Sequence, residues 1–391
     1  LLAAFLSAAA AVSLGVTRFA YGLLLPAMRQ DLGWSYTLAG AMNTSNAVGY
    51  CVGAMATGRI MASFGPAKSL LWGAWAATVL MLVPGFFVDS TVLILQRFIA
   101  GVLSAVVFVA GGILAARLGS RRTDKAGLVL GVYYGGTGTG IALSALVVPW
   151  MLDRAQMPLA SWMVAWWALA LVCAVLVVFL RFPVRVFAAW DVAAGQAAAV
   201  APLPVRWWPM RYALLGYAFF GFGYIGYMTF AIALLREHGA SSAEVGFFYA
   251  VLGVMVMASS RIWAGLLNTH RGGGALMRLN LLLGFAVVLP AISENFYVFV
   301  ASGALFGAVF LSIVASTTAF VRLNLPPAAW SAGIAAFTVV FALGQVVGPL
   351  AVGWVADSHG GLVRGFFYSA LVLWFGALCA GMQNPLPSMT G

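Results

Sequence analysis

The chain has 391 residues, of which 63% are hydrophobic and only 7% are charged, against roughly 25% in an ordinary soluble domain. So few charges cannot cover a soluble protein of this length without exposing large apolar patches, which excludes a soluble enzyme and favours a polytopic helical membrane protein. The net charge of +11 does not indicate nucleic-acid binding, because the chain has only two lysines and no dense basic cluster. The three cysteines, Cys51, Cys173 and Cys379, lie far apart in apolar runs and predict no redox role.

Twelve apolar segments follow one another along the chain, each about 20 residues long, the length that an α-helix needs to cross a bilayer. They cover residues 3–28, 36–57, 67–88, 91–116, 126–150, 159–181, 210–235, 244–267, 275–292, 296–320, 331–356 and 362–382. The first segment resembles the core of a signal peptide, but its apolar run continues through Tyr21 to Leu25. We therefore expect it to span the membrane.

The basic residues predict the orientation of these segments, since cytoplasmic loops retain Lys and Arg. With the N-terminus inside, fourteen Lys and Arg residues fall on the cytoplasmic side and four on the other side, which also receives seven of the nine acids. We therefore expect both termini to be cytoplasmic.

The one long polar connection, residues 182–209, is rich in Ala and Pro and lies at the midpoint of the chain. It predicts a cytoplasmic linker between an N-terminal half, residues 1–181, and a C-terminal half, residues 210–382. Residues 383–391 would form a cytoplasmic tail.

An internal repeat supports this division. A shift of 206 residues places Gly15 on Gly221 and Tyr21 on Tyr227, and the pair Trp150 and Asp153 recurs as Trp354 and Asp357. Parallel halves joined by a linker are typical of transporters with a central cavity between the halves.

Three segments carry a resemblance to a known family. The turn GRIMASFGPAK (Gly58 to Lys68) resembles the loop signature of the major facilitator superfamily, although Ala62 and Ser63 replace its Asp-Arg pair, and LILQRFIAGVLSA with Arg97 is similar to the fourth-helix motif. More narrowly, TRFAYGLLLPAMRQDLGWSYTLAG (Thr17 to Gly40) resembles the YbfB/YjiJ-type family of bacterial transporters.

The resemblance implies the major facilitator fold, an all-α membrane protein with twelve transmembrane helices in two pseudo-symmetric six-helix halves. It also implies a monomer in the bacterial inner membrane that transports by alternating access, with no enzyme activity, cofactor or metal. Gly58 and Gly65 would then contribute to gating. The antiporter motif has a Gly-Pro pair in the fifth segment, but the first proline of this segment is Pro149, near its end. This departure disfavours a drug antiporter.

Two ionisable side chains lie well inside the predicted membrane segments, where charges are costly and are functional candidates by default. Arg18 lies near the middle of the first segment, and Arg97 lies about two turns into the fourth. Because arginine stays charged, each needs an acceptor, either an anionic ligand or a backbone carbonyl. We expect Arg18 to anchor the anionic group of a substrate, and Arg97 either to couple or gate transport or to tie an unwound stretch of helix.

No Asp, Glu or His falls at mid-membrane in this topology, so simple proton coupling has little support. Asp31, Asp89 and Glu244 lie near outer helix ends, and we assign Asp31 to coupling or gating with Arg97. Exchange or facilitated movement of an anion fits at least as well.

The remaining candidates are polar or aromatic. Tyr217, Tyr224 and Tyr227 fall on one face of the seventh segment, where they either stack against a substrate ring or simply pack. Further substrate-binding candidates are Tyr21, Asn43, Asn46 and Gln345, with interhelical hydrogen bonds as the alternative for the amides.

The sequence thus predicts a carrier for a small organic anion, a carboxylate that can be aromatic. An efflux carrier for amphipathic compounds is the alternative. Metal transport is disfavoured, because no His shares a helix with a nearby Met.

Overall fold

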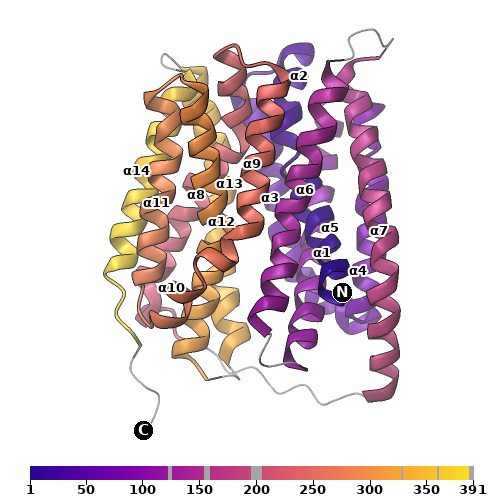
Figure 1. Cartoon of the computed structure of the whole chain (residues 1–391), viewed down its shortest axis with the longest axis vertical. Helices are drawn as coiled ribbons and strands as arrows, with labels where there is room; N and C mark the ends of the chain where they lie inside the picture. Colours follow the sequence, from indigo (N-terminus) through magenta and orange to yellow (C-terminus); the bar gives the residue numbers. More distant parts are fainter. Residues whose placement is uncertain (122–125, 154–158, 195–204, 327–328, 359–360, 387–391) are drawn as a thin grey trace.

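The computed structural model describes residues 1–121, 126–153, 159–194, 205–326, 329–358 and 361–386. All regular elements in these ranges are helices, which run roughly parallel to one long axis (Figure 1). The long ones follow the predicted segments and are α3 (Tyr36–Phe64), α4 (Pro66–Leu80), α5 (Ser90–Ser120), α6 (Ala126–Leu152), α7 (Ser161–Ala194), α8 (Arg211–Glu237), α9 (Ser242–Ile262), α11 (Gly274–Ile292), α12 (Phe296–Asn324), α13 (Trp330–Asp357) and α14 (Gly361–Gly381). A short helix, α10 (Ala264–Thr269), follows α9.

The first apolar segment is interrupted. It consists of α1 (Leu2–Ala10), a π-helical stretch η1 (Ala11–Val16), a turn over residues 17–20 and α2 (Tyr21–Leu32). The segment predicted at 3–28 is therefore two helices around a break rather than one helix. Such breaks occur at membrane depth only where other parts of the protein bind the freed backbone groups.

Eleven helical segments of the described chain are long and apolar enough to cross a membrane, so this is a multi-pass membrane protein. The remaining predicted segment, the second along the chain (residues 36–57), is helix α3, whose polar run from Asn43 to Asn46 lowers its hydropathy. Helix α3 nevertheless packs closely within the bundle. A side chain on Gly49 would meet the Phe98 carbonyl of α5, and one on Gly40 would meet the Pro349 carbonyl of α13.

Helix α7 continues to Ala194, well beyond its predicted end at residue 181. The buried Phe187 and the cation–π contact of Arg121 with Trp190, at 3.5 Å, hold this extension against the bundle. The linker predicted at 182–209 thus begins later than expected. Residues 195–204 of that linker and 387–391 of the predicted tail lie outside the described residues.

The internal repeat reappears in the packing. A Cβ on Gly15 would lie 2.7 Å from Gly140 Cα of α6. Its repeat partner Gly221 lies on α8, and a Cβ on Gly344 of α13 would lie 3.0 Å from the Gly221 carbonyl carbon. The same close glycine contact between two helices therefore occurs twice, and a side chain at either place would have to move backbone atoms.

In Figure 1 the elements from α1 to α7 (indigo to magenta) lie on one side and those from α8 to α14 (rose to yellow) on the other. Helices α6 and α9 pack closely where the two sides meet. A side chain on Gly138 of α6 would meet the Gly253 carbonyl of α9. Two further pairs pack closely across this boundary, α3 with α13 and α2 with α8, where a Cβ on Gly22 would lie 2.6 Å from the Met228 carbonyl oxygen.

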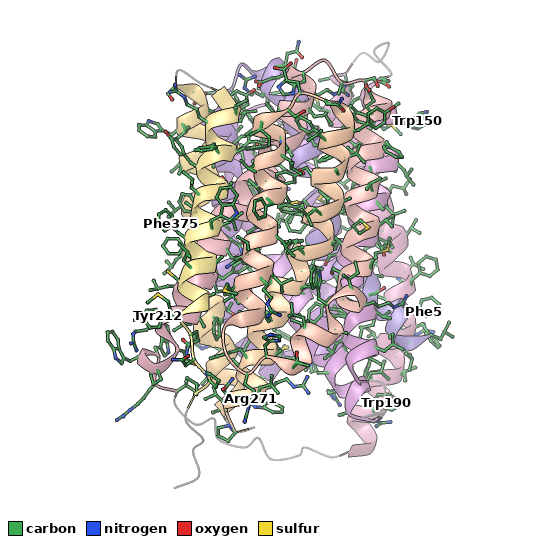
Figure 2. All side chains as sticks on the ribbon, turned by 60° about the vertical axis from the view of Figure 1, so that its left-hand side comes forward. Phe5, Trp150, Trp190, Tyr212, Arg271 and Phe375 are labelled. Carbon is green, nitrogen blue, oxygen red and sulfur yellow. The ribbon has the colours of Figure 1, made fainter. Side chains whose placement is uncertain are left out.

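The two ends of the bundle differ in charge. We call one the acidic end, defined by Asp31, Asp153, Glu237 and Asp357, and the other the basic end, defined by Arg121, Arg211, Arg271 and Arg322. Figure 2 places Arg271 at the lower end with Tyr212 and Trp190, and Trp150 near the opposite end.

Candidate functional site

The break after η1 is held by side chains from neighbouring helices. Arg97 of α5 donates hydrogen bonds to the carbonyls of Thr17 (Nη1, 2.9 Å) and Arg18 (Nη2, 3.3 Å). Tyr249 of α9 donates to the carbonyl of Phe19 at 2.7 Å. The two bonds from Arg97 supply donors to carbonyls that a regular α-helix would pair with the N–H groups of Tyr21 and Gly22, so the chain can pass from η1 through the turn into α2 without leaving these carbonyls unpaired.

Arg97 therefore binds the carbonyls of the turn between η1 and α2. The side chain is buried, and its guanidinium also lies 4.8 Å from the centroid of the Tyr21 ring. Its Nη2 donates a third bond, to Asn43 Oδ1 at 3.0 Å.

Arg18 lies within the break and points elsewhere. It is 3% exposed, and it donates a hydrogen bond to Gln345 Oε1 of α13, on the other side of the bundle. Its guanidinium carbon lies 5.1 Å from the Tyr50 ring centroid and 5.8 Å from that of Phe19. None of these partners carries a negative charge, so the guanidinium is buried against neutral groups.

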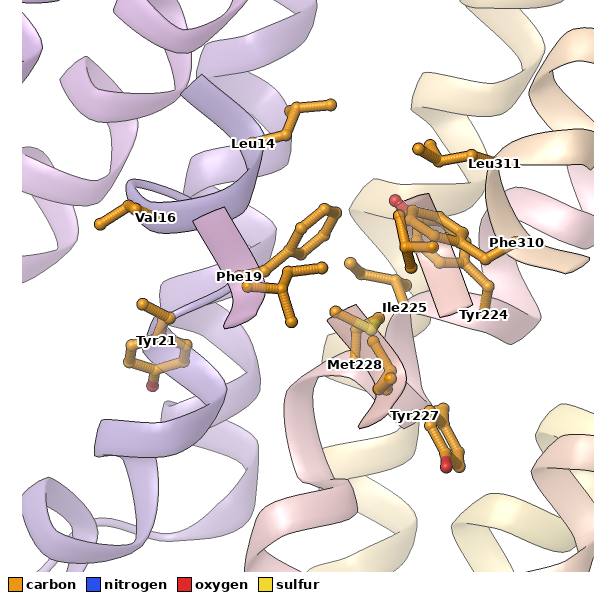
Figure 3. Close-up of a cluster of buried hydrophobic side chains, with 14 of the residues drawn as sticks. Leu14, Val16, Phe19, Tyr21, Tyr224, Ile225, Tyr227, Met228, Phe310 and Leu311 are labelled. Carbon is orange, nitrogen blue, oxygen red and sulfur yellow. The ribbon is translucent and has the colours of Figure 1, made fainter. Parts of the chain in front are cut away.

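Two of the predicted amides belong to the Arg97 network. Asn43 donates to Thr229 Oγ1 of α8 at 2.6 Å, and Asn46 donates to the Arg97 carbonyl at 3.0 Å. Tyr21 donates to the Ala39 carbonyl at 2.9 Å. Figure 3 shows Tyr21 directed away from α8, whereas Phe19 points toward Ile225 and Met228 of that helix.

A wall of stacked rings lies beside Arg18. Tyr224 stacks on Phe341 with ring centroids 5.6 Å apart and on Phe310 at 5.1 Å, and Phe220 stacks on Tyr224 at 4.8 Å. Tyr224 is the repeat equivalent of Arg18, and Phe310, on which it stacks, lies 5.7 Å from the ring of Phe19, the neighbour of Arg18 in the chain. The structure thus brings together Arg18, Gln345 and Tyr224 of the predicted site.

One tyrosine that sequence reasoning missed belongs to this region. Tyr50 of α3 is half-buried, and the guanidinium carbon of Arg18 lies 5.1 Å from its ring centroid. No local signal marked Tyr50, because its proximity to Arg18 depends on how α3 packs in the bundle.

The other predicted tyrosines lie apart from Arg18. Tyr217 is one end of the aromatic stack, 5.0 Å from Phe341. Tyr227 bonds Ser302 at 2.8 Å and stacks on Phe306 at 4.3 Å, among α12 residues. Tyr227 therefore contributes to packing in the second half of the chain.

The predicted gating residues lie at the two ends of the bundle. Asp31 accepts a hydrogen bond from Trp162 Nε1 at 2.7 Å at the acidic end. Gly65, with φ of 75°, ends α3 and begins α4, and Gly58 has no atom within 4 Å of a Cβ placed on it. The positive φ at Gly65 favours glycine there.

The other two acids near helix ends are helix caps. Asp89 accepts from the backbone of Thr91 and Val92 at the start of α5, and Glu244 forms a capping box with Ser241 at the start of α9. Among the described residues, no three His, Cys, Asp or Glu side chains gather as a metal site.

The fold is shared with solved transporters. Two crystal structures of the nucleoside transporter NupG, one of them of a point mutant, superpose with TM-scores of 0.69 and 0.70 and cover 97–98% of this chain and 98% of theirs. At 12–13% sequence identity this likeness concerns the fold alone. The chain therefore has the helical fold of these membrane transporters.

The particular family follows from the sequence. Residues 10–381 match the family described as "Uncharacterised MFS-type transporter YbfB", and the chain belongs to this family. This confirms the resemblance of the segment from Thr17 to Gly40, and it identifies a transporter rather than an enzyme.

Two curated relatives, each named "Putative tartrate transporter" and both from Agrobacterium vitis, are 29% identical to the chain over 158 residues. The match covers 37% of this chain and 34% and 32% of the two relatives. The chain thus matches about a third of their length.

Proposed function

We propose that this protein carries a small organic anion across the bacterial inner membrane by alternating access, as a secondary active or facilitative transporter. In this proposal α3 is the twelfth spanning segment. The two six-helix halves are residues 1–181 and 210–382, and they rock about the site at Arg18. The basic end, with both termini, faces the cytoplasm.

The proposal rests on the buried charge of Arg18. A buried guanidinium is always charged, and in this site it faces only an amide oxygen and aromatic rings. Among the described residues no carboxylate pairs with Arg18, and an anionic ligand would supply this opposite charge. The position of Arg18, at a helix break in the middle of the bundle, is where transporters of this architecture bind substrates.

The aromatic wall narrows the substrate class. The rings of Tyr224 and Phe341 are nearly parallel, at 14° to each other, and stack on one another. A planar ring that carries a carboxylate would satisfy both features, since it stacks while its charge meets Arg18. The tartrate transporters named above support the anionic part of this proposal.

The site also bears on energy coupling. Asp31, Asp89 and Glu244 all have structural partners at the acidic end, so none of them is available as a simple proton carrier beside Arg18. Exchange or facilitated movement of the anion, with its charge neutralised by Arg18, therefore fits these contacts best.

Efflux of amphipathic compounds is the second candidate. The continuous stack of Tyr217, Phe220, Tyr224, Phe310 and Phe341 favours it, because such a surface binds apolar and cationic ring systems as well as acids.

A thermal-shift screen of the purified protein separates the two. We expect benzoate or tartrate to raise Tm and tetraphenylphosphonium to have no effect, and stabilisation by the cation alone would favour efflux.

Uptake of the stabilising anion into proteoliposomes should be lost in Arg18→Ala and in Arg18→Lys, which cannot bind a carboxylate bidentately. Arg278→Ala, at an exposed arginine of the basic end, is the matched control; uptake by Arg18→Ala at the control level would overturn the proposal.

A further inference from the structure

Gln345 has an unusual place in the site. It is a polar side chain at mid-membrane, 1% exposed, and its Oε1 accepts the hydrogen bond from Arg18. Because arginine has no acceptor, the atom that faces it must be the amide oxygen whichever way the amide is drawn. The Nε2 group of Gln345 is then left buried without a partner.

An unpaired donor at this depth is costly, and among the described residues the side chain of Gln345 bonds only Arg18. By contrast, the buried Asn43 bonds with both of its polar atoms, to Arg97 and to Thr229. Gln345 also comes from the opposite side of the bundle, so its bond to Arg18 joins α13 to the broken first segment.

We propose that Gln345 is a neutral placeholder for the substrate, which occupies Arg18 in the empty carrier and which the substrate anion displaces. This inference rests on the proposed function, because it takes Arg18 as the anion anchor. A neutral acceptor satisfies the guanidinium when no substrate is present, but it binds arginine more weakly than a carboxylate does. The carrier can therefore release its substrate without leaving the Arg18 guanidinium without an acceptor. A new substrate anion can still displace the Gln345 amide oxygen from Arg18.

The placeholder model predicts opposite effects for two substitutions at one position. Gln345→Glu supplies a built-in carboxylate that pairs with Arg18, so the affinity for benzoate or tartrate should fall at least tenfold. Gln345→Leu removes the competitor, so the affinity should rise about three- to tenfold, because the anion no longer has to displace the amide oxygen that accepts the charged hydrogen bond from Arg18. A residue that merely packs would weaken binding in both variants.

A double-mutant cycle on Tm tests the pair without any ligand. Gln345→Glu should raise Tm in the wild-type background and lower it in Arg18→Ala, where the new carboxylate is buried and unpaired. Equal effects in the two backgrounds would overturn the proposal, as would a Gln345→Glu protein that binds the anion like the wild type. If no anion stabilises the wild type, the proposed function fails for these substrates, and the cycle alone decides whether Gln345 is poised against Arg18.

Discussion

The Asp357 carboxylate lies at the first turn of α3, where it accepts a hydrogen bond from the backbone N–H of Tyr36 at 2.7 Å. It also accepts from the Thr37 backbone at 2.8 Å. The repeat equivalent of Asp357 is Asp153, which accepts a hydrogen bond from Ser242 at the start of α9. Each carboxylate ends a helix on one side of the bundle and sits on the positive end of a helix on the other side.

These two contacts join the two sides of the bundle at the acidic end. We therefore expect Asp357→Ala to favour separation of the two sides at this end. A carboxylate at a helix N-terminus contributes about 0.3 to 1 kcal/mol, so the open population should rise about two- to fivefold, and more when Asp153→Ala is added. Spin labels on the exposed Leu159 and Tyr297, in a cysteine-free background, would report the separation of the two sides at this end. An unchanged distance distribution in the double variant would show that the carboxylates do not hold this end closed.

Arg97 and Arg18 should respond differently to substitution. Arg97→Met leaves the carbonyls of Thr17 and Arg18 without donors inside the bundle, which costs about 3 kcal/mol and should lower Tm by about 5 °C or more. Arg18→Ala removes a group whose protein partner is one amide, so its Tm should stay within about 2 °C of the wild type while anion binding is lost. Thermal unfolding of both variants in detergent tests this contrast, and a larger loss of Tm in Arg18→Ala would reverse the roles assigned to the two arginines.

Much of this architecture could be predicted from the sequence, because each spanning helix needs about 20 apolar residues regardless of what surrounds it. The repeat was visible for a similar reason, since Gly15 and Gly221 are both required where two backbones approach closely. The break at residues 17–20 could not be predicted, because it depends on donors from Arg97 and Tyr249, which are distant in the sequence.

The site was only partly predictable for the same physical reason. A charged residue in an apolar segment is conspicuous, so Arg18 and Arg97 were found, but the sequence does not tell which atoms they bond. Tyr50 resembles any other aromatic residue of a membrane helix. Its place near Arg18 arises only when α3 packs beside the first segment.

The close glycine contacts should be intolerant of even one methyl group. In Gly15→Ala the new Cβ would lie 2.6 Å from the Thr137 carbonyl oxygen and 2.7 Å from Gly140 Cα, both of them backbone atoms. We expect a destabilisation of about 1 to 3 kcal/mol. Gly127→Ala is the matched control, because a Cβ there meets nothing within 4 Å, and helix propensity should leave its Tm equal or slightly higher. Equal Tm values for the two variants would show that α6 can move away from η1.

Gly58 and Gly40 lie on the same helix, α3, but only Gly40 is in contact with the other side of the bundle. A side chain on Gly40 would meet the Pro349 carbonyl of α13 at the acidic end, whereas one on Gly58 would meet nothing within 4 Å.

If the two sides alternate between closing at one end and closing at the other, Gly58 becomes the crowded position when the basic end closes. Gly58→Leu should then keep the wild-type Tm and anion binding but abolish transport, because the added side chain prevents the basic end from closing and keeps the acidic end closed. Gly40→Leu should instead push the acidic end apart. The spin-label pair at Leu159 and Tyr297 would register an increased distance for Gly40→Leu and none for Gly58→Leu, and wild-type uptake by Gly58→Leu would exclude this position from the closing surface.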